Sequence, residues 1–175
     1  MTRISYANRG QDLEDLIERT NQEYVRQGQA LVQKIPTPVK VLDTNYNTGR
    51  ITGFYKKKST VDYRGTYKGY SLAFDAKETS VETRLDLGNI ATHQYTHLAT
   101  HVANGGIGFL VVWFKSQDEI YYLPFELLDE YWQGMSNGGR KSIPYDEIAK
   151  EKYKIEQGKN LVLVDYLKVV ESVIA

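Results

Sequence analysis

Two carboxylates and a lysine are spaced so that a single hairpin would bring them together. Asp75 and Lys77 lie in a stretch where apolar residues alternate with other types, and Asp62 precedes them. Residues two apart in a β-strand share a face, so Asp75 and Lys77 would point the same way. Lys68-Gly69 suits a two-residue hairpin turn. Around that turn Asp62 would lie opposite Asp75, with Cβ atoms roughly 4.5–5.5 Å apart.

Such a cluster has a definite chemistry. Two carboxylates this close repel each other unless a cation joins them. A hard ion such as Mg²⁺ takes one or two protein carboxylates and keeps several waters or phosphate oxygens. The spacing is therefore consistent with a metal site that acts on a phosphodiester, with Lys77 beside the attacking water. Because the pattern is short and common, the residues alone favour the alternative, a solvated hairpin face on which Lys77 bridges the two aspartates.

Several short motifs that surround the cluster favour the metal site over the solvated hairpin face. They are Asn8-Arg9-Gly10 with Leu13-Glu14, Pro36-Thr37-Pro38-Val39, Ser59-Thr60-Val61-Asp62-Tyr63, Tyr67-Lys68-Gly69, Asp75-Ala76-Lys77-Glu78-Thr79, His93-Gln94 and Asn137-Gly138-Gly139-Arg140-Lys141-Ser142-Ile143. In this order they resemble the RecU family of Holliday junction resolvases, which belongs to the PD-(D/E)xK nuclease superfamily. Each motif is weak alone, but the resemblance runs over nearly the whole chain.

The resemblance implies a fold, an activity and a set of site residues. The fold would be α/β, with a restriction-endonuclease-like mixed central sheet flanked by helices and a protruding β-hairpin stalk. The activity would be Mg²⁺-dependent cutting of four-way DNA junctions by a homodimer, with Mn²⁺ able to replace Mg²⁺. The resemblance implies metal contacts from Thr60, Asp62, Asp75 and Gln94, and a catalytic role for Lys77 together with the two aspartates.

Two further residues take roles from the same resemblance. Tyr55 matches an aromatic position that contacts the junction centre, and packing in the core is the alternative for it. Glu14, on the first expected helix, would hold a second cation or order the site, and plain surface solvation is the alternative.

The chain departs from the family pattern in two ways. Asp75 stands where RecU proteins usually carry Glu, and the shorter side chain would shift the metal slightly. The sequence also begins close to Asn8, without the longer basic arm of familiar members, which suits a phage-encoded relative.

Composition limits the remaining classes of protein. We expect one nuclease domain over residues 1–175, because this length can enclose its own core. Lys plus Arg and Asp plus Glu number 22 each, so a protein that coats polyanions is not indicated. Cysteine is absent, no apolar run is long enough to span a bilayer, and no signal peptide opens the chain. A soluble cytoplasmic protein without a membrane partner is expected.

A basic segment nevertheless precedes and overlaps the expected site. We expect its cationic side chains and one tyrosine to contact DNA phosphates and bases, and a solvated basic hairpin is the alternative. The residues are Arg50, Tyr55, Lys56, Lys57, Lys58 and Arg64.

Periodicity and turn residues outline the elements that would position the site. Helices are expected over 10–28, 86–104, 124–133 and 165–175, the last capped by Asp165. Strands are expected over 39–42 and 51–57, forming a projecting hairpin 39–57, and over 108–114 and 119–123. The catalytic hairpin occupies 60–77, and a glycine-rich loop occupies 136–140.

The three histidines offer a competing chemistry. His93, His97 and His101 are spaced by four on one expected helix, and such a pair can bind zinc. A zinc site would still need a third ligand. The alternatives are histidines on the helix surface or partly buried, or His93 or His97 at the edge of the nuclease site beside Gln94.

The sequence thus predicts an Mg²⁺-dependent endonuclease that resolves four-way junctions by paired nicks in recombination and repair. A restriction-type or repair nuclease of the same fold, a catalytically weak junction-binding module and a zinc protein stay open as alternatives. The residues identify neither a preferred cleavage sequence nor any recombination protein as a partner.

Overall fold

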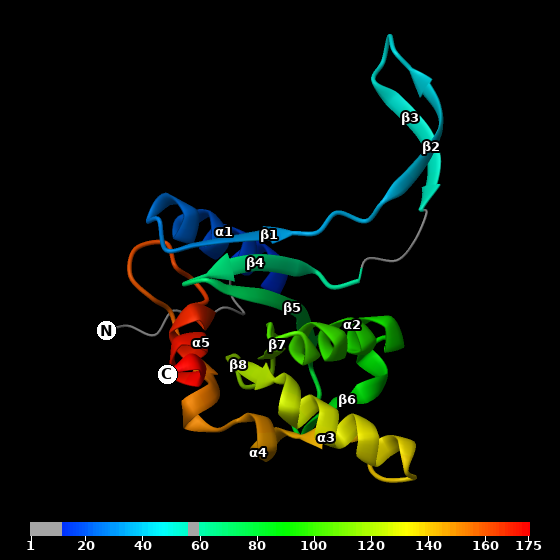
Figure 1. The fold of residues 1–175 in the computed structure, drawn as a ribbon. Helices are drawn as coiled ribbons and strands as arrows, with labels where there is room; N and C mark the ends of the chain where they lie inside the picture. Colours follow the sequence, from blue (N-terminus) through cyan, green and yellow to red (C-terminus); the bar gives the residue numbers. More distant parts are fainter. Residues whose placement is uncertain (1–11, 56–59) are drawn as a thin grey trace.

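The computed structural model describes residues 12–55 and 60–175, and its body is a mixed sheet between two layers of helices (Figure 1). The six strands run in the order β1 (Ala30–Lys34), β4 (Tyr63–Tyr67), β5 (Tyr70–Thr79), β7 (Ile107–Phe114), β8 (Glu119–Pro124) and β10 (Lys154–Ile155). Strands β5 and β7 are parallel, and the other neighbouring pairs are antiparallel. The predicted mixed sheet flanked by helices is confirmed.

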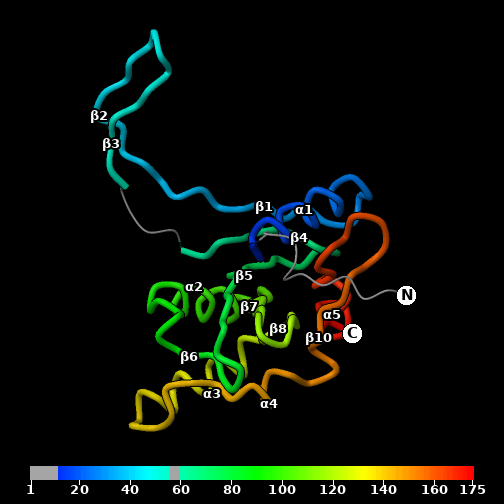
Figure 2. Tube along the Cα trace, turned by 180° about the vertical axis from the view of Figure 1, so that it is seen from behind, coloured from blue at the N-terminus to red at the C-terminus, as the bar shows by residue number. Residues whose placement is uncertain are grey.

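Each face of the sheet has its own core. Helices α1 (Leu13–Arg26) and α5 (Tyr166–Ile174) pack with one face, and α2 (Thr92–Ala103), α3 (Phe125–Ser136) and α4 (Tyr145–Ile148) lie over the other. The view from behind separates the same two groups (Figure 2). On the α2 side, β6 (Arg84–Asp86) and β9 (Ser142–Pro144) form a small second sheet. Every residue of β7 after Ile107 is buried, as expected for a central strand covered on both faces.

The hairpin of β4 and β5 has the register predicted from its turn. Tyr63 pairs with Phe74 and Tyr67 pairs with Tyr70, so the connection is Lys68-Gly69. Both turn residues have positive φ, 48° and 85°, which is the conformation of a type I′ turn and matches the twist of the strands. The turn chemistry therefore sets which side chains meet at the open end of the hairpin.

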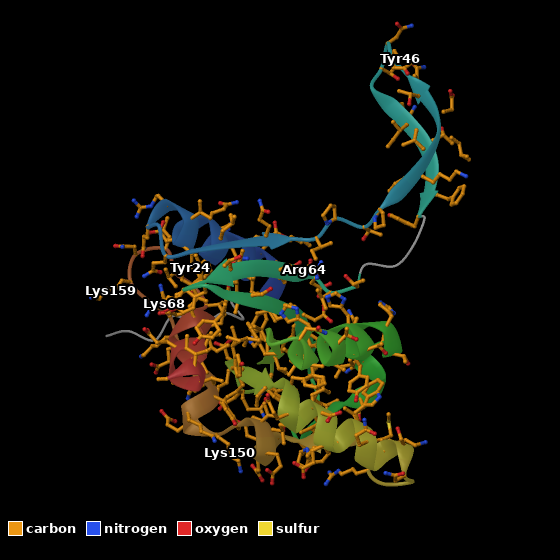
Figure 3. All side chains as sticks on the ribbon, in the orientation of Figure 1. Tyr24, Tyr46, Arg64, Lys68, Lys150 and Lys159 are labelled. Carbon is orange, nitrogen blue, oxygen red and sulfur yellow. The ribbon has the colours of Figure 1, made fainter. Side chains whose placement is uncertain are left out.

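A second hairpin projects from the body. Strands β2 (Val39–Asn45) and β3 (Arg50–Tyr55) pair only with each other among the described strands, and Thr44 is their single residue that is not exposed. Tyr46 lies at the far end of this arm, away from the body that carries Arg64 (Figure 3). The predicted protruding hairpin is confirmed over 39–55, while Lys56 and Lys57 lie outside the described residues.

Several expected boundaries are wrong. Strand β1 was not expected. The first helix, expected over 10–28, ends at Arg26, and Gly28, with a φ of 66°, lies between that helix and the strand. The second helix begins at Thr92 rather than at 86, since β6 pairs with β9 and a 3₁₀ turn over Leu87–Asn89 follows it.

Asp165 lies at the N-cap position of the last helix, as expected, but its side chain does not cap the helix. Oδ1 of Asp165 instead accepts from the Tyr24 hydroxyl at 2.8 Å. Within the described part of the chain, no helix is both long and apolar enough to cross a bilayer.

Candidate active site

Asp62 and Asp75 meet at the open end of the β4–β5 hairpin. The backbone N–H of Asp62 donates to Oδ1 of Asp75 at 2.6 Å, and the backbone N–H of Ala76 donates to Oδ2 of Asp62 at 3.2 Å. Each carboxylate is thus held by a backbone donor of the other strand. The expected meeting of these residues across the hairpin follows from the register, although Asp62 itself precedes the first ladder pair.

Burial distinguishes the two aspartates. The Asp75 side chain has no exposed surface, whereas Asp62 is half-buried. The pKa of Asp75 is raised to about 7, first by burial and then by the negative charge of Asp62, while the positive charge of Lys77 opposes the rise. Its Oδ2 is buried and has no hydrogen-bond partner in the described part of the molecule.

An orphaned carboxylate oxygen beside a second carboxylate fits a divalent cation. Such an ion would supply the partner that Oδ2 lacks and would offset the repulsion between the two groups. No three His, Cys, Asp or Glu side chains cluster as a metal site within residues 12–55 and 60–175. The donor set near the hairpin is therefore two carboxylates, which is the set that Mg²⁺ commonly takes in proteins while keeping waters.

Lys77 shares a face of β5 with Asp75, as the alternation predicts, and that face lies beneath α2. The Nζ of Lys77 donates to Oε1 of Gln94 at 2.9 Å. The same Oε1 accepts the backbone N–H of Ala91 at 3.1 Å, at the start of α2. The structure thus brings Asp62, Asp75, Lys77 and Gln94 to one place.

Other predicted residues have different surroundings. Thr60 is exposed and lies two residues before Asp62, next to the buried Val61. Glu14 lies on α1, and its carboxylate pairs with Lys34 rather than with either aspartate. Glu14 is thus already partnered by a cation of the protein.

The histidines of α2 do not form a zinc centre in the described structure. His93 is exposed. His97 is half-buried, and burial first, then the charges of Arg64 and His101, lower its pKa. Nε2 of His101 lies 3.1 Å from the carbonyl oxygen of Ser71. Since no third ligand joins these rings in the described residues, the zinc alternative loses its support.

The candidate DNA-contacting residues divide between the arm and the body. Arg50 and Tyr55 are on the projecting hairpin, and Tyr55 is 76% exposed, so the core-packing alternative for it is wrong. Arg64 is exposed on β4, two residues after Asp62, so it shares the face of that strand with the site. Lys56, Lys57 and Lys58 lie outside the described residues.

One residue next to the site was missed. Glu78 follows Lys77 but faces the opposite side of β5, where its Oε1 accepts the backbone N–H of Leu13 at 2.7 Å. Its other carboxylate oxygen pairs with Lys115. Glu78 thus ties the start of α1 to the strand that carries Asp75 and Lys77. The only sequence signal was a charged residue at an inward-facing position of a buried strand.

Comparison with known proteins gives the family. The model of the RecU family, Recombination protein U, matches residues 8–172. The protein named Holliday junction resolvase RecU from Oenococcus oeni is 40% identical over 168 residues, covering 94% of this chain and 85% of that protein. The proteins of the same name from Limosilactobacillus reuteri (40% over 174 residues; 97% and 85%) and Staphylococcus epidermidis (39% over 175 residues; 98% and 84%) are similar.

One solved structure matches this chain at low sequence identity. Archaeoglobus fulgidus Hjc, titled a Holliday junction resolvase, matches with a TM-score of 0.40 and 11% identity, over 65% of this chain and 77% of that one. At this level the likeness carries no argument, whereas the family match spans almost the whole sequence. The chain belongs to the RecU family.

Proposed function

We propose that this protein is a divalent-metal-dependent endonuclease that resolves four-way DNA junctions. The observation that carries the proposal is the buried Asp75 carboxylate, whose Oδ2 has no partner in the described residues and which adjoins Asp62. The relatives that match nearly the whole chain are named Holliday junction resolvases, which supports this substrate.

Asp62 and Asp75 would hold the metal, which we take to be Mg²⁺, with Mn²⁺ able to replace it. A bound divalent cation supplies Lewis acidity and lowers the pKa of the water that it carries. The protein's own contribution is the geometry: each carboxylate is fixed by a backbone N–H of the neighbouring strand. Thr60, two residues before Asp62, can add an oxygen ligand directly or through water.

Lys77 acts on the reacting phosphodiester. Its ammonium lies on the same face of β5 as Asp75 and is directed at Gln94. From there it orients the attacking water and stabilises the negative charge that develops on the phosphorus-bound oxygens. This role needs a charged donor in a partly buried place, where electrostatic interactions are stronger than in bulk water.

The proposed working unit is a dimer with two-fold symmetry. Resolution of a junction needs two nicks on strands of like polarity, and each chain supplies one set of Asp62, Asp75 and Lys77. Two copies related by a two-fold axis would present two such sites to a junction that is itself close to symmetric.

The test is a nicking assay on a synthetic four-way junction and on a linear duplex with the same sequences. We expect symmetric nicks near the junction centre in Mg²⁺ or Mn²⁺, and none in EDTA. Cutting of both DNAs at equal rates would instead indicate a nuclease of other specificity. Tight junction binding without cutting in either metal would indicate a binding module and would overturn the catalytic assignment.

A further inference from the structure

The face of the sheet that carries Asp75 continues past α2 as an exposed surface. Strands β1 and β4 send their buried side chains to the core on the side of α1. Since side chains alternate along a strand, the other residues of these two strands point to the opposite face, the one on which α2 lies. Those residues are Leu31, Gln33, Arg64 and Thr66, and all of them are exposed.

Arg64 lies in the middle of this surface on a firmly held strand. It is paired with Gln33 of β1 on one side and with Ala73 of β5 on the other. Cross-strand neighbours have Cβ atoms about 4.5–5.5 Å apart, so the amide of Gln33 can donate to a group that Arg64 binds. Ala73 is buried and short, so it does not cover the guanidinium from the other side. Arg64 belongs to the body and not to the arm (Figure 3).

The guanidinium of Arg64 also lies near α2. Burial lowers the pKa of His97, and the positive charge of Arg64 lowers it further, which requires the two side chains to be close. His97 is three residues after Gln94, so both lie on neighbouring positions of the helix surface. Arg64 therefore borders the place where Asp62, Asp75, Lys77 and Gln94 meet.

Arg64 has no carboxylate to neutralise it. Lys34 pairs with Glu14, and Lys68 pairs with Glu171. Arg64, in contrast, forms no ion pair within residues 12–55 and 60–175. Its planar fork of donors is suited to two oxygens of a phosphate, and no acidic side chain competes for it.

The spacing along β4 matches the backbone of a nucleic acid. Arg64 follows Asp62 by two residues, which corresponds to about 6.5 Å along a strand. Successive phosphates of a DNA strand are separated by a similar distance. If the phosphate to be cut lies at Asp62 and Asp75, its neighbour on the same DNA strand therefore comes to Arg64.

We infer that Arg64, with Gln33 as a second, uncharged donor, forms a subsite for the phosphate next to the scissile one on the strand that is cut. The inference rests on the proposed function, because it takes the scissile phosphate to lie at Asp62 and Asp75. A strand held at one phosphate can still rotate about it, whereas a second held phosphate fixes its direction through the site. Arg64 is thus a positioning residue for the substrate.

Binding cycles between protein and DNA test the subsite. Junctions carry a single uncharged methylphosphonate at successive positions of the cut strand, and affinity is measured in Ca²⁺ with the parent, Arg64→Gln and Lys77→Gln. At one position the neutral group should weaken binding by the parent about 3- to 10-fold and have no further effect on Arg64→Gln. That position should adjoin the one that is coupled in the same way to Lys77→Gln.

Salt dependence separates the two donors. Arg64→Gln should reduce the slope of log affinity against log salt by about one, because one phosphate contact by a cation is lost. Arg64→Lys, which keeps the charge, should restore that slope. Gln33→Ala should be coupled to the same phosphate as Arg64 but leave the slope unchanged, since no charge is removed. Parental affinity in Gln33→Ala would overturn the two-donor subsite.

Positioning has its own readout in the single-turnover rate of bound junction. The parent should cut a junction with the neutral group at the Arg64 position about tenfold more slowly than an unmodified one, even when all of the DNA is bound. Arg64→Gln should cut the two junctions at equal rates. An effect on affinity without any effect on this rate would show that Arg64 only adds attraction and does not position the strand.

Lys150→Gln is the matched control, because it removes one positive charge from an exposed part of the body far from Arg64 (Figure 3). It should be coupled to neither of the two phosphates. Coupling of Arg64 to the same phosphate as Lys77, to one further away, or to none would overturn the inference. The cycles in Ca²⁺ need no cleavage, so a parent that bound junctions without cutting would remove the proposed function, while the order of the two coupled phosphates would still decide on the subsite.

Discussion

The two carboxylate oxygens of Asp75 have different surroundings, and only one of them is hydrogen-bonded to Asp62. One oxygen, Oδ1, accepts the backbone N–H of Asp62 at 2.6 Å, and the other, Oδ2, is buried without a partner among the described residues. The first contact fixes the hairpin end, and the second leaves a desolvated acceptor that only a cation or a proton can satisfy. A substitution that keeps one oxygen acceptor but removes the charge should therefore preserve the contact with Asp62 and lose the cation site.

Asp75→Asn should lose cleavage but keep the fold and the junction affinity. The amide oxygen can still accept from Asp62, while the metal loses a charged ligand and the DNA surface loses one negative charge. We expect the single-turnover rate to fall by about 100-fold or more in Mg²⁺. Junction binding, measured in Ca²⁺, should be equal or tighter.

The control for charge alone is Asp146→Asn, which removes a negative charge from an exposed position of α4. It should leave the cleavage rate unchanged. If Asp75→Asn cut within tenfold of the parent, the two aspartates would not be the metal site.

The stability of the metal-free protein should fall as the pH rises. The pKa of Asp75 is raised from 3.8 to about 7 in the folded state, first by burial and then by the charge of Asp62. A group whose folded pKa is raised contributes stability that is complete below its unfolded pKa and is lost as the pH rises through the folded value. The free energy of unfolding, measured in urea with EDTA, should therefore decrease between about pH 4 and pH 8 relative to Asp75→Asn.

Added Mg²⁺ should reverse this loss. The ion replaces the proton on the Asp75 carboxylate, so its stabilising effect should be larger at pH 8 than at pH 5.5. Parallel pH profiles for the parent and Asp75→Asn in EDTA would show that this carboxylate is already ionised in the metal-free protein.

The proposed two-fold symmetric unit predicts that the protein is a dimer in solution. Light scattering at the concentration of the nicking assay should give twice the mass of the 20.1 kDa chain. Mixing the parent with an excess of Asp75→Asn should then produce junctions with a single nick, because a mixed dimer carries one competent site. A monomer that still makes paired cuts would require one chain to act twice.

Local rules were enough to predict the hairpin that carries the site. The turn residues Lys68 and Gly69 adopt positive φ, and this fixed connection sets the register that brings Asp62 to Asp75. The alternation of apolar residues likewise predicted that Asp75 and Lys77 share a face. These inferences needed only short-range geometry.

Contacts between distant segments were beyond those rules. Tyr24 binds Asp165 across 141 positions, which takes the expected cap away from α5. Strand β1 exists because Ala30–Lys34 pairs with β4, and its own composition gave no warning of this. The bond from Lys77 to Gln94 depends on where α2 begins, and that boundary is set by the pairing of β6 with β9.

The projecting hairpin should give the preference for junctions over linear duplex. Its side chains are almost all exposed, so it has little core of its own and can be shortened without disturbing the sheet. It carries Arg50, and Lys40 lies with its Nζ 5.8 Å from the ring centre of Phe54. An arm of this kind can enter the opening of a four-way junction, where phosphates of several strands converge.

Replacement of residues 43–52 by a tight turn should therefore leave the metal site intact and remove the selectivity. The cut deletes Tyr46, which is 91% exposed at the far end of the arm. It keeps Tyr55, which is 76% exposed and pairs with Val39 at the opposite end of the hairpin. A tyrosine stacked on an exposed base pair contributes about 1–3 kcal/mol. Comparing the deletion with Tyr46→Ala and Tyr55→Ala in the intact arm assigns that stacking to one of the two rings.

The measurement is competition binding of a four-way junction against linear duplex at one fixed salt concentration, in Ca²⁺. The trimmed protein should bind both DNAs alike, and its Mn²⁺ affinity should equal the parent's, because Asp62 and Asp75 lie on the body rather than on the arm. Lys159→Gln, which removes one positive charge from the body at a place remote from the arm, is the matched control and should keep the preference. A trimmed protein that still preferred junctions would place selectivity in the arrangement of two bodies around the DNA.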